Sequence, residues 1–217
     1  ALMRDLDHAL GLIDAVVGAV DLPVTLKMRL GWDGGCLNAP DLARRARDAG
    51  VRMVTVHGRT REQFYTGSAD WSAIRAVRDA VPDLPLVANG DVVDEASARA
   101  ALDRSGADAV MVGRGAQGAP WRLAQISARL HGTPAPGVPR GAALADAIAA
   151  HHDDILSHYG RDLGLRVARK HLGWYAQAAG AGEGRRTLMS AASAAEVHAA
   201  IRAVFSGAPG DARADAA

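Results

Sequence analysis

The sequence predicts an α/β protein built on a parallel β-sheet, followed by a small all-α domain. Four short apolar runs alternate with four helical patterns at nearly regular intervals up to residue 131. A Pro/Gly-rich linker follows at 132–141, and beyond it the pattern is helical only. Regular alternation of this kind is typical of a parallel sheet whose strands are joined by right-handed crossover helices.

The elements of the first part have recognisable start and stop signals. Apolar residues recur at helical spacing over 6–20, and the segment 21–23 interrupts them with a proline. Gly50 ends the helix that follows Pro40, and Pro120 is expected at the first helical position of the last helix in this part. Further helices are expected over 71–81 and from 94–95 onward. The expected strands are 23–29, 53–57, 84–89 and 107–112.

Three helical patterns follow the linker. They cover 142–159, 163–178 and 194–205, which together predict a helical domain over 142–206. The polar, alanine-rich segment 207–217 is expected to be a disordered tail.

Composition excludes several classes of protein. The chain has 217 residues with 25 basic and 24 acidic side chains, and this balance argues against nucleic-acid binding through positive charge alone. A single cysteine, Cys36, rules out an internal disulfide framework and a multi-cysteine zinc site. No apolar run is long enough to predict a membrane span. Only Lys27 and Lys170 are lysines, so arginine fills almost every cationic position.

Each predicted strand ends in polar or glycine-rich residues. These endings are 27–29, 57–59, 89–91 and 113–115. Because the carboxyl ends of parallel strands meet at one edge of the sheet, the four endings together predict a functional site there.

Lys27 and His57 are candidate functional residues at the ends of the first two strands. Strand alternation places Lys27 on one face together with Arg29, and a buried ammonium needs an anionic or strongly polar partner. Neutral imidazole donates one hydrogen bond and accepts another, which suits the edge of a heterocycle. The alternatives are a lysine paired with a carboxylate and a structural histidine.

Two of the four endings favour a phosphate. Glycines let backbone N–H groups approach a phosphate without interference from Cβ, and Arg114 offers a planar fork of donors. In (β/α)₈ barrels the phosphate site is often built from the loops after the last two strands, and these are the last two strand endings before the helical part. Two left-handed turns with an exposed arginine remain the alternative.

Aromatic residues follow several strand endings and are interleaved with arginines, a pattern that suits stacked bases and phosphates. For Trp71 and Trp121 we favour packing between helices and sheet. His151 and His152 have no partner at metal-ligand spacing, so they are expected at the surface and no metal site is predicted.

Five ordered motifs closely resemble the tRNA-dihydrouridine synthases, in particular the bacterial B-type branch. They are Pro-Val-Thr-Leu-Lys-Met-Arg-Leu-Gly-Trp at 23–32, Val-His-Gly-Arg-Thr-Arg-Glu-Gln at 56–63, Ala-Asn-Gly-Asp at 88–91, Met-Val-Gly-Arg-Gly-Ala at 111–116 and Arg-Lys-His-Leu-Gly-Trp-Tyr at 169–175. The resemblance extends from residue 1 to about 205.

The resemblance implies a (β/α)₈ TIM barrel that binds FMN, followed by a helical tRNA-binding domain. In such an enzyme NADPH reduces the flavin, hydride passes to C6 of uracil, a cysteine protonates C5, and the base flips out of its stack to reach the flavin. Lys27 and His57 would contact the isoalloxazine ring. The phosphate and ribityl tail would be held by Asn89, Gly90, Asp91, Gly113 and Arg114.

The same resemblance implies tRNA as the partner. We further expect a cytoplasmic monomer, with no metal and no membrane association. Contacts to substrate or tRNA are expected from Arg29, Arg59, Arg61, Arg169 and Lys170.

The sequence departs from the family in two large respects, the acid cysteine and the length of the barrel. The family's acid cysteine lies in an Asn-x-Gly-Cys-Pro segment, which the chain lacks, and Cys36 in Gly-Gly-Cys-Leu-Asn does not match it. A closed barrel takes about 250 residues, whereas 131 precede the linker. We therefore expect 1–131 to be the C-terminal half of the barrel, about four βα units, and the isolated chain to be inactive, with no catalytic residue assigned.

Two other functions remain open. One is a different FMN-dependent TIM-barrel oxidoreductase that acts on a free pyrimidine, which the helical domain argues against. The other is a non-catalytic fragment that binds FMN or tRNA.

Overall fold

The computed structural model describes residues 2–207, so the predicted tail lies outside the described residues except for Gly207. The strands are β1 (Thr25–Arg29), β2 (Met53–His57), β3 (Leu86–Asn89) and β4 (Ala109–Met111). The α-helices are α1 (Leu6–Ala19), α2 (Ala39–Asp48), α3 (Trp71–Ala80), α4 (Glu95–Ser105), α5 (Arg122–Leu130), α6 (Gly141–Tyr159), α7 (Arg161–Ala178), α8 (Arg185–Ser190) and α9 (Ala194–Phe205). Short 3₁₀ helices cover Leu2–Arg4, Arg114–Ala116 and Gly182–Gly184.

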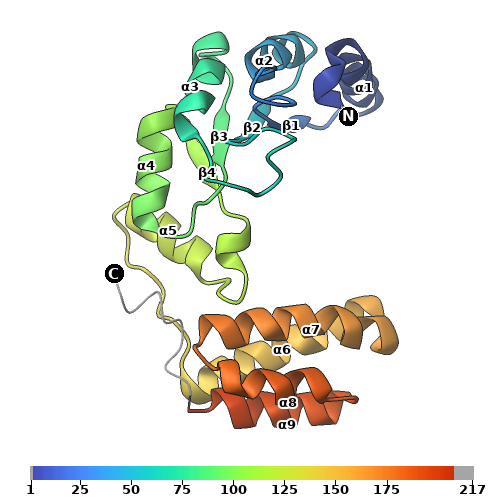
Figure 1. Cartoon of the computed structure of the whole chain (residues 1–217), viewed down its shortest axis with the longest axis vertical. Helices are drawn as coiled ribbons and strands as arrows, with labels where there is room; N and C mark the ends of the chain where they lie inside the picture. Colours follow the sequence, from blue (N-terminus) through green and yellow to red (C-terminus); the bar gives the residue numbers. More distant parts are fainter. Residues whose placement is uncertain (1, 208–217) are drawn as a thin grey trace. The chain divides into compact units, whose positions relative to one another are not determined.

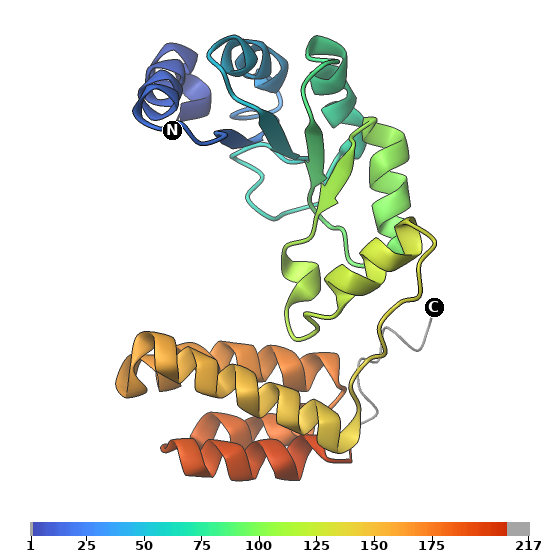
Figure 2. The same ribbon diagram turned by 180° about the vertical axis from the view of Figure 1, so that it is seen from behind.

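The four strands form one parallel sheet in the order β1-β2-β3-β4. Parallel neighbours need a crossover connection, and α2, α3 and α4 supply one between each successive pair. Figures 1 and 2 show α1 to α4 along the same face of the sheet. The α/β class and the parallel pairing predicted from the sequence are confirmed.

Burial along the strands explains this arrangement. In β1 the side chain of Met28 is buried, whereas Thr25 and Lys27 are exposed, as the predicted alternation requires. The central strands β2 and β3 are buried almost throughout, and Val54, Val56 and Leu86 are fully buried.

Aspartates begin several helices. Asp70 accepts a hydrogen bond from the backbone N–H of Ala73 at the start of α3. At the start of α4, Asp94 and Ser97 exchange the reciprocal bonds of a capping box. These caps fix the points at which the loops after β2 and β3 turn into helices.

The structure differs from the expected bounds in a few places. The third strand begins at Leu86 rather than at 84, because Pro85 has no N–H for the ladder. Pro120 is not at the first helical position: α5 begins at Arg122, after Trp121 as its N-cap. The short helix α8 and the 3₁₀ turn at Arg114 were not predicted, since six and three residues carry too little periodicity.

The chain divides into two compact units, one ending at Gly115 and the other beginning at Ala116. The second unit has its own core, built from apolar side chains of α6 to α9: Leu144, Ile148, Leu172, Leu188, Ile201 and Phe205. The expected boundary between 131 and 132 rests on the linker composition and stays a prediction.

Among the helices of residues 2–207, none combines the length and the apolarity that a membrane span requires.

Candidate functional site

Strand register brings the predicted residues of the first unit to one edge of the sheet. Arg29 pairs with His57 and His57 pairs with Asn89, so these three residues stand side by side at the ends of adjacent strands. Asn89 in turn pairs with Met111 and donates from its side-chain amide to the Met111 carbonyl at 2.8 Å. The site predicted from four separate strand endings is therefore one continuous edge.

The loop between β2 and α3 folds back over this edge. The Gly58 N–H donates to the Asn89 carbonyl, and the Asp70 N–H donates to the Gly58 carbonyl. A Cβ at Gly58 would lie 2.8 Å from the Asp70 oxygen, so this close return requires glycine. Arg29 holds the far part of the loop by donating to the carbonyls of Thr60 and Phe64, at 2.7 and 2.9 Å.

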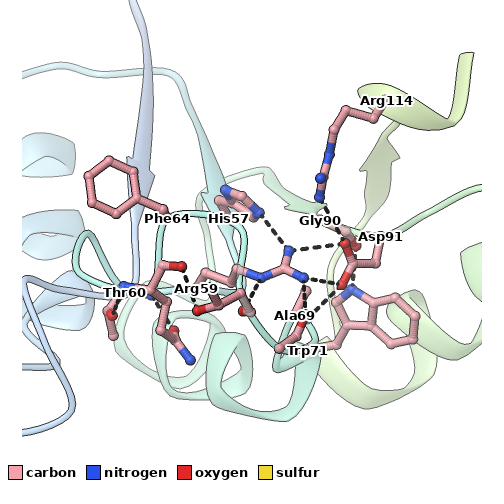
Figure 3. Close-up of polar contacts among 12 residues, drawn as sticks. His57, Arg59, Thr60, Phe64, Ala69, Trp71, Gly90, Asp91 and Arg114 are labelled. Atoms are coloured by element: carbon pink, nitrogen blue, oxygen red, sulfur yellow. Dashed lines mark hydrogen bonds and ion pairs between the residues drawn. The ribbon is translucent and has the colours of Figure 1, made fainter. Parts of the chain in front are cut away.

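Arg59 is the centre of the site (Figure 3). Its side chain is only 2% exposed. The guanidinium donates to both carboxylate oxygens of Asp91, at 3.0 and 2.6 Å, and to the carbonyls of Thr66 and Gly67. The family resemblance implies that Arg59 contacts substrate or tRNA, but its donors are used inside the protein, so the structure favours a positioning role.

Asp91 ties the loops after β2 and β3 together. Besides Arg59, it accepts the backbone N–H of Ala69 at 2.8 Å, and Arg114 lies 3.5 Å away. Burial alone would raise the pKa of Asp91, but the bonds from Arg59 and Ala69 outweigh it and lower that pKa. Its φ of 55° is rare for a residue other than glycine, and this contact network holds it there.

His57 is held as a neutral imidazole. Its Nε2 lies 3.4 Å from Nη1 of Arg59, and because a guanidinium only donates, Nε2 is the acceptor and Nδ1 carries the proton. Burial, and then the positive charges of Arg29, Lys27 and Arg59, lower the pKa of His57 to about 4. At neutral pH the ring therefore offers one N–H donor and adds no charge.

We expect an NMR titration of the His57 ring to give a pKa near 4 rather than the ordinary 6.5. Since the folded-state pKa is the lower one, the unfolded chain binds the proton first, and His57 reduces stability as the pH falls from 6.5 towards 4. Urea unfolding of His57→Gln across this range should show a shallower loss of stability than the unchanged chain. An ordinary pKa for His57, or an unchanged slope in the variant, would contradict this electrostatic account.

Glycines leave the edge accessible next to His57. Gly90 has a φ of 110°, and a Cβ there would lie 2.7 Å from Cδ2 of His57. Around a Cβ at Gly113 there is no heavy atom within 4 Å among the described residues, so the backbone there borders open space. A Cβ at Gly115 would meet the Val92 carbonyl at 2.5 Å. Close packing thus explains why Gly90 and Gly115 are glycines, whereas Gly113 leaves space in which a ligand could approach the backbone.

Cations outnumber anions at this edge. Lys27 is exposed, and within residues 2–207 no hydrogen bond or ion pair to its ammonium is found. Partial burial of that group and then the charge of Arg29 lower its pKa, which indicates an ammonium without a counter-ion. The predicted alternative, a lysine paired with a carboxylate, does not describe Lys27 in the structure.

Exposed aromatic side chains stand beside these cations. Phe64 and Tyr65 project from the β2–α3 loop, and Phe64 has a positive φ of 48°. The guanidinium of Arg61 lies over the Phe64 ring at 4.1 Å, and that of Arg114 over the Tyr65 ring at 4.5 Å. Flat surfaces of this kind suit stacking with a base.

The other candidate residues lie outside this edge. Arg169 and Lys170 are exposed on α7, in the second unit, where Lys170 lies 5.9 Å from the Trp174 ring. Cys36 belongs to a tight turn after β1, in which its carbonyl accepts the Trp32 N–H. The prediction that His151 and His152 lie at the surface is wrong for His152, which is 1% exposed.

The sequence did not reveal the Arg59–Asp91 pair or the strained Phe64. The two paired residues are 32 positions apart, and only the fold brings them together. The signal that could have been used is the position of Arg59, two residues beyond a buried strand end, where an arginine needs a partner.

Taken together, these features define an α/β protein whose sheet carries, at its carboxyl edge, a cationic and glycine-rich site with a neutral imidazole. Such a site fits a ligand that combines a phosphate with a heterocycle.

Comparison with known proteins gives the family. A family model described as "Dihydrouridine synthase (Dus)" matches residues 1–208. The chain belongs to the dihydrouridine synthase family, and its similarity to proteins named tRNA-dihydrouridine synthase B supports the B-type branch.

Three relatives illustrate the similarity. A "Probable tRNA-dihydrouridine synthase" of Rhodobacter capsulatus is 65% identical over 206 residues, which cover 95% of this chain and 63% of the relative. A protein of the same name from Rhizobium leguminosarum is 56% identical over 175 residues, covering 81% and 53%. A "tRNA-dihydrouridine synthase B" of Xanthomonas campestris is 44% identical over 177 residues, covering 82% and 53%. The chain thus spans between about half and two thirds of these relatives.

Proposed function

We propose that this chain forms the FMN-binding part, and a tRNA-binding helical domain, of an enzyme that reduces uridines in tRNA to 5,6-dihydrouridine. The observation that carries the proposal is the carboxyl edge of the sheet, where a neutral His57, an unpaired Lys27 and an exposed Arg114 surround open backbone at Gly113. The names of the relatives point to the same reaction.

The residues at this edge fit FMN. The phosphate would meet the guanidinium of Arg114 and the open backbone at Gly113, where a side chain would occupy the space that the phosphate needs. The isoalloxazine ring would lie near Lys27 and His57. When bound, FMN supplies hydride to C6 of uracil after reduction by NADPH.

The protein's own residues would bind the FMN ring and fix its orientation. His57 offers its Nδ1–H to a ring acceptor, and its low pKa keeps that donor neutral throughout the physiological range. Lys27 would bring a positive charge to this edge, which would suit an electron-rich ring. Arg59 positions His57 and Asp91 without touching the ligand, since its donors are already used.

The exposed side chains of Phe64 and Tyr65 would stack with nucleotides beside the reactive uridine, and Arg29 and Arg61 would hold the loop that carries them. A uridine inside the tRNA fold must leave its stack to reach a ring bound at this edge.

In this proposal the four strands are the C-terminal half of a TIM barrel, residues 142–206 bind tRNA, and the general acid at C5 is a cysteine outside this chain. Cys36 does not fill that role, because its turn does not match the family's Asn-x-Gly-Cys-Pro segment. We therefore expect the purified chain to give no dihydrouridine from unmodified tRNA, NADPH and FMN; measurable turnover would contradict this assignment of the acid.

FMN affinity tests the phosphate contact proposed for Arg114 and the ring contact proposed for Lys27. Replacing Arg114 or Lys27 by glutamine should weaken FMN binding by about tenfold each, the cost of one charge-assisted hydrogen bond. Isothermal titration calorimetry on the purified chain measures it. Arg44→Gln, which removes an exposed arginine of α2, is the matched control. Equal FMN affinity in all three variants would exclude the proposed FMN site.

Binding of tRNA tests the helical domain and separates this function from action on a free pyrimidine. Replacing both Arg169 and Lys170 by glutamine should lower tRNA affinity and reduce the slope of log affinity against log salt by about 1.5, as expected for two lost phosphate contacts. Arg202→Gln on α9 is exposed and serves as the control. If the chain binds tRNA no more tightly than it binds uridine, the free-pyrimidine function is favoured instead.

A further inference from the structure

Three metal-ligating side chains meet on the second unit, where α6 packs against α9. His152 and Asp153 are neighbours on α6, and His198 is on α9. The Asp153 Oδ1 lies 2.8 Å from Nε2 of His198 and 3.4 Å from Nδ1 of His152. One ligand atom from each residue lies within 4.8 Å of the other two.

His152 is buried but not fully used by the fold. Its side chain is 1% exposed, and its Nε2 atom is buried without a hydrogen-bond partner in the described structure. A buried polar atom without a partner costs free energy, so an internal imidazole is retained only if something else compensates. The other ring nitrogen of His152, Nδ1, faces Oδ1 of Asp153, which also lies beside His198, and this convergence of three side chains points to a shared ligand.

We propose that His152, Asp153 and His198 form a binding site for a divalent transition-metal ion, with Zn²⁺ as the best match. Two imidazoles and one carboxylate are a donor set that zinc accepts. Ligand atoms of a tetrahedral zinc site lie about 3.3 Å apart, and the separations of Asp153 Oδ1 from Nε2 of His198 and Nδ1 of His152, 2.8 and 3.4 Å, lie close to that spacing.

The site is accessible on one side. Asp153 and His198 have 57% and 26% of their side chains exposed, whereas His152 closes the site from within. An ion can therefore enter from solvent and keep a water as its fourth ligand. The ion takes the place of the proton that His198 shares with Asp153, and that proton passes to solvent or to the other ring nitrogen.

Such an ion would link α6 to α9 by bonds that do not depend on the apolar core. Because it binds the folded chain and not the unfolded one, it should stabilise the second unit in proportion to its concentration. This inference is independent of the proposed function, since none of the three residues lies at the carboxyl edge of the sheet.

The test uses the purified chain, freed of metal by a chelator and titrated with ZnCl₂ in a calorimeter. We expect one saturable site and a rise in the thermal midpoint, and Co²⁺ should give the visible absorption of tetrahedral coordination. His198→Gln and Asp153→Asn should each weaken Zn²⁺ binding by at least about tenfold. Replacing a residue that only hydrogen-bonds to a metal ligand already lowers metal affinity by that factor, and these two residues are proposed as ligands themselves. Both positions are partly exposed, and circular dichroism checks that the variants fold.

Two matched variants make the result decisive. His158→Gln removes an exposed histidine of the same helix and should leave Zn²⁺ binding unchanged. His171→Gln removes one of another histidine pair, whose rings lie 5.2 Å apart, and should also leave it unchanged. Absence of saturable binding overturns the proposal, as does binding that is lost in His171→Gln and retained in His198→Gln.

Discussion

Replacing Arg59 by methionine is expected to destabilise the chain by about 3 kcal/mol, the cost of leaving one partner of a buried ion pair uncompensated. Methionine fills much of the same volume but removes the donors to Asp91, Thr66 and Gly67. The half-buried charge of Asp91 then keeps only the Ala69 N–H and Arg114, its strained backbone has less support, and His57 loses its neighbour. FMN binding should fall together with stability.

Urea unfolding measures this loss of stability, and two further variants identify its cause. Arg61→Met makes the same chemical change two residues further along the loop, where only a contact with the Phe64 ring is lost, and should cost less than about 1 kcal/mol. Adding Asp91→Asn to Arg59→Met should recover part of the loss, because it removes the carboxylate charge that has lost its bidentate partner. If Arg59→Met is as stable as Arg61→Met, the pair does not organise the site.

Replacing Gly90 by alanine is the second large effect, about 3 kcal/mol of lost stability. The new Cβ would stand 2.7 Å from Cδ2 of His57 and 2.8 Å from Cβ of Ala69, in a backbone conformation with a φ of 110°. Overpacking and left-handed strain each cost about 1–3 kcal/mol. Because His57 is the side chain that must move, the ring-contacting donor is displaced as well.

Gly11→Ala is the matched control for this substitution. Gly11 lies within α1, where the new methyl group meets no heavy atom within 4 Å among the described residues. The change should stabilise the helix by about 0.5–1 kcal/mol. Gly90→Ala with unchanged stability and an unchanged His57 pKa would show that the close packing of Gly90 on His57 has no role.

Much of the first unit could be predicted because its signals are local. Alternation in β1 separates Lys27 from Met28, and polar residues directly after apolar runs mark the edge that the register then assembles. The centre of the site could not be predicted in the same way. Arg59 resembles any arginine of a polar loop until the fold brings Asp91 to it, and neither its burial nor the low pKa of His57 follows from spacing.

In the helical unit, by contrast, the sequence did contain a signal that His152 is buried. Leu144, Ile148, His152 and Ile155 recur at helical spacing and are all buried, so His152 lies on the apolar stripe of α6. The prediction that His152 lies at the surface was wrong because it relied on the polarity of histidine and not on the position of His152 along this stripe. His198 could not be linked to it from sequence, since 45 residues separate His198 from Asp153.

In the proposed function, the carboxyl edge of the sheet binds the phosphate of FMN. The most direct measurement compares FMN with riboflavin, which has the same ring and no phosphate, in ¹H–¹⁵N NMR titrations of the chain. We expect both ligands to shift the signals of His57 and its neighbours, and FMN alone to shift the amides of Gly113 and Arg114. Equal shifts at Gly113 and Arg114 with both ligands, or saturable FMN binding that leaves them unmoved, would contradict the account.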